Sequence, residues 1–182
     1  MCSRFWKNWS VKAWCVSLID DLRKFSTRSW QERWLFLEAF ILLGMMRALI
    51  LLLPFRKITA MLGLGQGVSP SVLQAEMTVD PVTVGWSIQA AAARTHWESA
   101  CLAQALTGLF MLSRRGINAT LYLGVARDES DPEVMAAHAW LRCGDTILTG
   151  AGGVERYSVI SSFARLPAGD RHRPPHNERT GP

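Results

Sequence analysis

Two residues of this chain, Cys101 and His138, could together carry out nucleophilic catalysis. The apolar pattern that follows Cys101 predicts a helix, so its thiol would stand in the first turn, where the unpaired amide groups and the helix dipole favour a thiolate. The residues around His138 predict a strand. An imidazole placed beside the thiol would complete a nucleophile and base pair. This pattern predicts acyl transfer or peptide cleavage.

In such a reaction His138 would take the thiol proton, Cys101 would attack a carbonyl carbon, and the backbone amide of Cys101 would stabilise the oxyanion. His138 would then protonate the leaving amine. Water as the final acceptor would make the enzyme a hydrolase and an amine would make it a transferase, and the sequence does not choose between them. His96 is a competing base. We expect it on the surface instead.

Three further polar or aromatic residues lie close to this pair in the sequence. Gln104 comes one turn after the cysteine, and we expect a polar residue on the helix surface rather than an oxyanion donor. Trp97 and Trp140 could roof a cleft, but we expect core residues rather than substrate contacts.

The surrounding pattern predicts an α+β fold in which a nucleophile helix packs on a small antiparallel sheet. The helix would cover residues 99–115, with Gly116 as its left-handed end, and one apolar face would pack on the sheet. A tight turn at Cys143-Gly144-Asp145 would join two of the strands. The strands are expected at 119–126, 138–142, 146–150 and 156–163.

An apolar helical region is expected before this sheet. A helix over residues 30–53 should stop at Pro54, which cannot continue the amide ladder. Residues 35–53 are nearly long enough to cross a bilayer, but Glu38 and Arg47 interrupt this run, so we favour a buried or bilayer-touching helix over a span. Phe55-Arg56-Lys57 would form a basic collar, the glycines of 63–67 a linker, and residues 84–94 an Ala-rich helix.

Composition limits the class of protein. With 182 residues, 49% of them hydrophobic, the chain suits one domain, which we place at 30–166. Its four cysteines are scattered and show no metal-type pairing with histidine, so we expect no metal, no cofactor and a reducing cytoplasm. The tail 167–182 has almost no apolar residue and is predicted to be disordered.

The first segment, 1–29, belongs to a basic, tryptophan-rich front. Residues 1–34 carry seven Lys or Arg against three Asp or Glu, and five of the eight tryptophans. This composition suits a membrane surface or a protein partner better than nucleic acid. A helix packed on the domain, with its charges in solvent, is the alternative.

The chain resembles a known family at Trp97-Glu98-Ser99-Ala100-Cys101-Leu102-Ala103-Gln104-Ala105, Leu112-Ser113-Arg114-Arg115-Gly116-Ile117, Leu123-Gly124-Val125 and Ala137-His138-Ala139-Trp140-Leu141. Together these segments are similar to the transglutaminase-like leader peptidases of lasso peptide biosynthesis, the family of the C-terminal domain of the microcin-processing B protein. The resemblance covers roughly residues 30–163. It implies a papain-like or transglutaminase-like cysteine peptidase fold.

The resemblance also implies a pathway. The enzyme would remove the leader from a ribosomally made precursor peptide, and a separate ATP-dependent cyclase would then form the macrolactam. The family's full-length form carries a winged-helix leader-recognition domain, for which the segment before residue 30 is too short. A separate recognition protein is therefore expected as a partner.

The family's histidine is oriented by an Asp on the following strand, and this chain departs from that pattern. A two-residue turn would carry His138 to the neighbourhood of Gly150 and Ala151, where no carboxylate stands. Asp145, at the turn, would be too far along the strand to hold the ring. A backbone carbonyl, a side chain such as Glu155, or a true Cys-His dyad remain as alternatives.

These observations predict a cytoplasmic cysteine peptidase, with a membrane surface as one candidate contact. Two rivals stay open. The first is an acyl transferase or amidase acting on another peptide. The second is a membrane-associated scaffold whose catalytic site has decayed, because the orienting carboxylate is missing and the front is apolar.

Overall fold

The computed structural model describes residues 29–69, 79–95, 100–127 and 135–165 of the chain. The chain divides into two units, Met1–Trp34 and Leu35–Pro182. The predictions for the basic front before residue 29, for the tail 167–182, and for His96 and Trp97 fall outside the described residues. The described residues therefore belong to the second unit, apart from residues 29–34.

Four helices lie in the described residues: α2 (Trp30–Leu52), α3 (Phe55–Met61), α4 (Pro81–Ala92) and α5 (Cys101–Ser113). The predicted stop at Pro54 is confirmed, since α2 ends at Leu52. A capping box opens α2, because Ser29 N–H donates to Glu32 Oε2 at 3.1 Å and Glu32 N–H donates to Ser29 Oγ at 3.3 Å. The expected basic collar is instead the first turn of α3, which Pro54 precedes as the N-cap.

Helix α4 begins three residues earlier than its Ala-rich pattern predicts. Asp80 is the N-cap, and its Oδ1 accepts from Val82 N–H at 3.0 Å. Pro81 can occupy the first helical position because an amide there would have no partner within the helix. The capping pair, rather than the apolar pattern, therefore decides where α4 starts.

The sheet is antiparallel, with the strand order β1-β5-β2-β3-β4. The predicted strands are present, and the one that carries His138 is longer than expected. Their bounds are β2 (Thr120–Arg127), β3 (Met135–Cys143), β4 (Thr146–Thr149) and β5 (Ser158–Ala164), with a 3-10 turn η1 (Val154–Arg156) before β5. The expected turn is confirmed by the pairing of Cys143 with Thr146.

The prediction of a plain linker at 63–67 is wrong. Gly65 and Gln66 form β1, in which Gly65 pairs with Ala164 and Gln66 with Phe163 on β5. Two residues are too few to show a strand period, and their partner strand lies near the other end of the described chain. Only the tertiary structure brings the two strands together.

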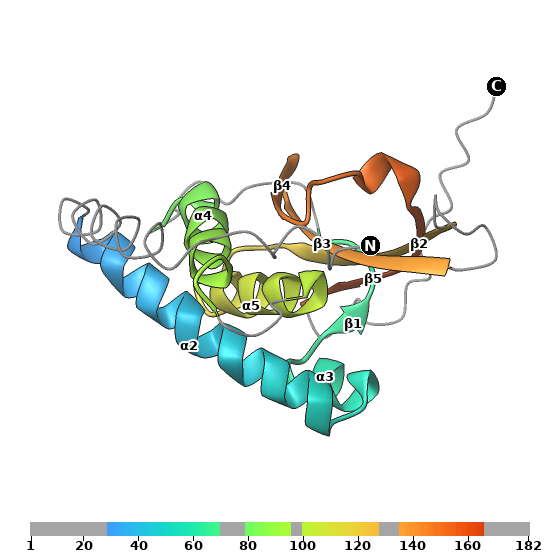
Figure 1. Ribbon diagram of the computed structural model, residues 1–182, viewed down its shortest axis with the longest axis horizontal. Helices are drawn as coiled ribbons and strands as arrows, with labels where there is room; N and C mark the ends of the chain where they lie inside the picture. The colour runs from blue at the N-terminus through green and yellow to red at the C-terminus, as the bar shows by residue number, and fades with distance from the viewer. Residues whose placement is uncertain (1–28, 70–78, 96–99, 128–134, 166–182) are drawn as a thin grey trace, which may run out of the picture. The chain divides into compact units, whose positions relative to one another are not determined.

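Helix α5 lies against one face of the sheet, as Figure 1 shows. Its apolar face is buried at Ala105, Leu106, Leu109 and Leu112, as the spacing predicts. The contact with β3 is close at Gly108, where an added Cβ would lie 2.5 Å from Leu141 Cδ2. A glycine at this point lets the helix approach the sheet.

Candidate active site

Cys101 is the first residue of α5, so the predicted position at a helix start is correct. The capping residue, Ala100, has no side chain that could bond the amide groups of the first turn. The Cys101 side chain is half-buried and packs against the core cluster. Gln104, one turn further on, is also half-buried.

Ser113, at the end of α5, and Arg165, just after β5, line the same pocket, and β5 ends beside the start of β2. The connection from α5 to β2 is therefore a reversal, so α5 runs antiparallel to β2 and in the same direction as β3. The connection is held at the far end of β3, where the Cys143 thiol donates to Asn118 O at 3.2 Å. Cys101 lies about 10 Å along the helix before Gly108. His138 lies about 10 Å along the strand before Leu141, the residue that Gly108 contacts. Thiol and imidazole are thus at the same end of the α5–β3 pair.

The His138 ring is held by one hydrogen bond and two aromatic neighbours. Its Nε2 lies 2.8 Å from Gly150 O. Its centroid lies 4.9 Å from that of Tyr157 and 6.0 Å from that of Trp140. Because a carbonyl oxygen can only accept, Nε2 carries the proton and Nδ1 is the basic nitrogen. The ring therefore has the tautomer that a general base needs, with Nδ1 as its acceptor.

Strand alternation places the His138 and Trp140 side chains on one face of β3 and those of Ala139 and Leu141 on the other. Leu141 is on the face that meets α5, so His138 lies on the opposite face. Tyr122 of β2 shares that opposite face, where its ring stacks on Trp140 at 5.7 Å. Among the described residues, no hydrogen bond joins the Cys101 thiol to the imidazole.

The edge of β3 near His138 is not covered by β4, which pairs only with Leu141, Arg142 and Cys143. Gly150 follows β4 and lies beside this edge, since a Cβ added to it would be 2.5 Å from Ala139 O. A thiol and an imidazole from the two faces could meet around this edge of β3. Catalytic hydrogen bonds are often long in free enzymes and shorten when substrate binds.

In the described residues, the backbone carbonyl of Gly150 orients the His138 ring. Gly150 lies at the position that the hairpin register predicts. Asp145 instead accepts from Arg142 at 2.9 Å, and Glu155 is exposed on η1, with no bond to the imidazole in the described part of the chain. Sequence reasoning missed the role of Tyr157, which the sequence predicts within the strand at 156–163 and which the structure places between η1 and β5.

The other described cysteine is chemically different from Cys101. Cys143 is buried, and desolvation raises the pKa of its thiol. It is therefore a poor nucleophile and a suitable control for Cys101. No group of three His, Cys, Asp or Glu side chains in the described ranges could hold a metal ion.

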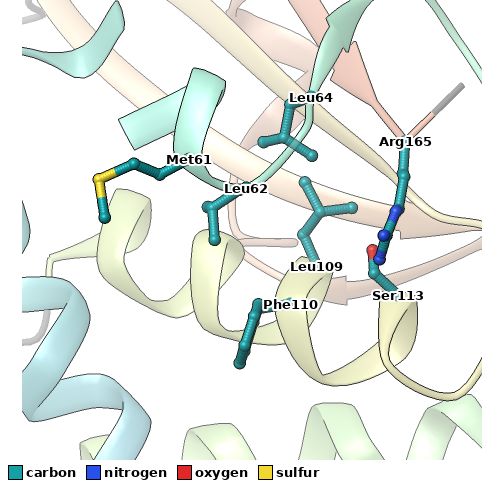
Figure 2. A pocket seen from close by; sticks show the side chains of 7 residues that line it. All are labelled: Met61, Leu62, Leu64, Leu109, Phe110, Ser113 and Arg165. Carbon is teal, nitrogen blue, oxygen red and sulfur yellow. The ribbon is translucent and has the colours of Figure 1, made fainter. Parts of the chain in front are cut away.

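A pocket of about 140 Å³ lies beside the second half of α5 and does not include Cys101 or His138. Figure 2 shows apolar side chains around it, among them Leu64 and Phe110, with Arg165 reaching toward Ser113 at one end. Its residues on α5 begin two turns after Cys101. The pocket is thus separate from the candidate active site.

Comparison with known proteins supports one family. Searches of curated proteins and of solved structures found no match. The family model described as "Transglutaminase-like superfamily" matches residues 43–162, which include α5, the sheet strands β2 to β4 and both candidate catalytic residues. This superfamily includes cysteine peptidases and acyltransferases. With more than half of its length matched, and with an α+β fold of helices on an antiparallel sheet, the chain belongs to the transglutaminase-like superfamily.

Proposed function

We propose that this protein is a cysteine peptidase that removes the leader from a lasso precursor peptide, with Cys101 as nucleophile and His138 as general base and then acid. The observation that carries the proposal is the hydrogen bond from His138 Nε2 to Gly150 O, at the end of β3 level with Cys101. With Nε2 bonded to this carbonyl, Nδ1 is the ring nitrogen that would accept a thiol proton.

In the proposed reaction the Cys101 thiol gives its proton to His138 Nδ1, and the sulfur forms a bond to the carbonyl carbon of the scissile peptide. The carbonyl electron pair moves to oxygen, where the Cys101 amide donates to it. When the oxyanion collapses, the C–N bond breaks and His138 protonates the amine. Water then attacks the thioester as His138 takes its proton, the C–S bond breaks, and the Cys101 sulfur regains the proton from His138 as the leader leaves as a carboxylic acid.

The choice of a lasso precursor rests on the resemblance of the Cys101 and His138 segments to leader peptidases of this pathway. A separate leader-recognition protein would present the precursor, and an ATP-dependent cyclase would condense the freed amine with a carboxylate side chain. The reaction would take place in the cytoplasm. No nucleic acid is involved.

Two other functions remain as alternatives. An acyl transferase would use the same thioester but pass the acyl group to an amine. A decayed scaffold is favoured by two observations: among the described residues Cys101 and His138 share no hydrogen bond, and the orienting group is a neutral carbonyl rather than a carboxylate.

The test is mass spectrometry of a candidate lasso precursor incubated with its recognition protein and the full chain, compared with Cys101→Ala, His138→Ala and Cys143→Ala. The peptidase proposal expects a free leader acid with the parent chain and with Cys143→Ala, and none with the other two. A leader amide formed only with an added amine would show a transferase. If every form binds the precursor and leaves it intact, the scaffold is correct.

A further inference from the structure

The outward face of α2 carries a stripe of exposed apolar side chains. Leu37, Ile41 and Met45 follow one another at intervals of four residues, and Ala48 and Leu52 continue the series at the spacing of one helix face. Ile41 is 61% exposed and Leu52 is 78% exposed. We call these five residues the α2 stripe.

No charged residue interrupts the α2 stripe. Glu38, next to its first member, is turned to the side by ion pairs with Arg115 at 2.5 Å and Arg114 at 3.3 Å. Arg47 is half-buried and lies away from the exposed face. A run of large apolar side chains on a protein surface marks a contact with lipid or with another protein.

Helix α2 is long and apolar enough to cross a membrane, with a mean hydropathy of 2.2 over its most apolar window. The opposite face of α2 nevertheless packs into the core of the domain. Leu35, Ala39, Leu42, Leu43 and Met46 are all buried there. A helix with one face packed on its own domain cannot be surrounded by lipid, so a position along a bilayer surface fits the structure and a span does not.

Two features favour lipid over a protein partner. Arg56 and Lys57, just after α2, are exposed and have no ion-pair partner among the described residues. In the sequence, residues 1–34 add a net positive charge and five tryptophans. Basic residues next to an apolar helix face bind anionic lipid headgroups, and tryptophan is enriched at the headgroup level.

We infer that the α2 stripe docks the protein on the surface of an anionic bilayer, with α2 in the plane of the membrane and Arg56 and Lys57 against the headgroups. This inference does not depend on the proposed peptidase activity. The Cys101→Ala form should therefore bind vesicles as well as the parent chain does.

The experiment is co-sedimentation of the full chain with vesicles of phosphatidylcholine alone and of phosphatidylcholine with phosphatidylglycerol. Ile41→Asp should weaken partitioning at least about tenfold, because it removes a large apolar group from the contact. Ile160→Asp is the matched control, since Ile160 on β5 is 63% exposed and lies outside the stripe. Circular dichroism and thermal melting confirm that each variant is folded.

A double variant, Arg56→Gln with Lys57→Gln, tests the contribution of the two positive charges to vesicle binding. Each lost cation should weaken binding to the anionic vesicles by about fivefold, and the loss should shrink as salt is raised. Binding to neither kind of vesicle would overturn the inference, as would equal losses for Ile41→Asp and Ile160→Asp. A dimer or a complex with the recognition protein that Ile41→Asp disrupts, without any vesicle binding, would show that protein rather than lipid covers the stripe.

Discussion

At the residue scale, the imidazole of His138 is oriented by an uncharged oxygen. A carboxylate would stabilise the imidazolium by a full charge, whereas the Gly150 carbonyl supplies only a dipole. The carbonyl nevertheless selects the same tautomer, because it accepts only from a protonated Nε2. Orientation is retained, and the stabilisation of the charged ring is weaker.

The position of this carbonyl depends on the backbone of Gly150, which has a φ of +74°. Gly150→Ala should lower the free energy of unfolding by more than about 2 kcal/mol, because a Cβ adds a clash with Ala139 O to the cost of a left-handed φ. Leader release should fall at least about tenfold, because the carbonyl of residue 150 shifts away from the imidazole that it orients. Denaturant unfolding and the cleavage assay measure the two effects.

Gly116→Ala is the control for that variant. Gly116 has a φ of +70°, but an added Cβ would have no atom within 4 Å. It should cost about 1 kcal/mol from conformation alone and leave cleavage unchanged. Equal losses of activity in the two variants would contradict the role given to the Gly150 carbonyl.

Because of the buried Cys143 thiol, we expect the free energy of unfolding to depend on pH in the alkaline range. Burial raises the pKa of its thiol in the folded state, so the unfolded chain loses the proton at lower pH than the folded one. Between the two pKa values the unfolded state binds fewer protons, and the free energy of unfolding falls as pH rises, by at most about 1.4 kcal/mol per unit. Below the unfolded pKa this contribution to stability is fully present.

Unfolding by urea at several pH values from 7 to 10 measures the effect. Cys143→Ala should unfold more easily at neutral pH, because it loses the bond to Asn118 O, but its stability should fall less steeply above the thiol's ordinary pKa. Parallel curves for the parent chain and the variant would show that Cys143 contributes nothing to the alkaline slope.

At the scale of elements, the distance between α5 and β3 is set by Gly108. A Cβ there would lie 2.5 Å from Leu141 Cδ2 and 3.1 Å from Ile88 Cδ1, and both side chains are fully buried. Alanine favours a helix by about 1 kcal/mol over glycine, but overpacking costs about 1 to 3 kcal/mol. We expect Gly108→Ala to be destabilising by about 1 kcal/mol.

A double-mutant cycle with Leu141→Val tests this cause, since the shorter side chain makes room for the added methyl group. The cost of Gly108→Ala should be smaller in the Leu141→Val background. Gly152→Ala, where a Cβ would meet no atom within 4 Å, should stay within about 0.5 kcal/mol of the parent chain. Additive effects at 108 and 141 would mean that their contact does not set the distance.

At the scale of the whole molecule, the tail 167–182 lies outside the described residues. The sequence predicts that it contributes nothing to the stability of the packed domain. A chain that ends at residue 166 should melt within about 1 °C of the full chain and cleave the precursor at the same rate. Thermal melting and the cleavage assay check both. A large loss of melting temperature would assign the tail to the folded domain.

Local pattern was sufficient for much of the fold and part of the site. Cys101 could be placed at a helix start and His138 on a strand because each follows from a periodicity within a few residues. The register of the hairpin at Cys143 and Thr146 predicted that His138 lies near Gly150, because a short turn fixes how its two strands pair. Strand β1 could not be found, because it exists only through its pairing with β5.

The sequence by itself determined helices α2, α4 and α5, the central strands, the transglutaminase-like superfamily and the neighbourhood of Gly150, but it did not predict α3. Only the tertiary structure decided that α5 packs on the face of β3 that carries Leu141, so that His138 lies on the other face with Trp140 and Tyr157. It also decided which face of α2 is buried and which forms the α2 stripe. Periodicity comes from the geometry of a single backbone segment, whereas the choice of face depends on burying side chains that lie far apart in the chain.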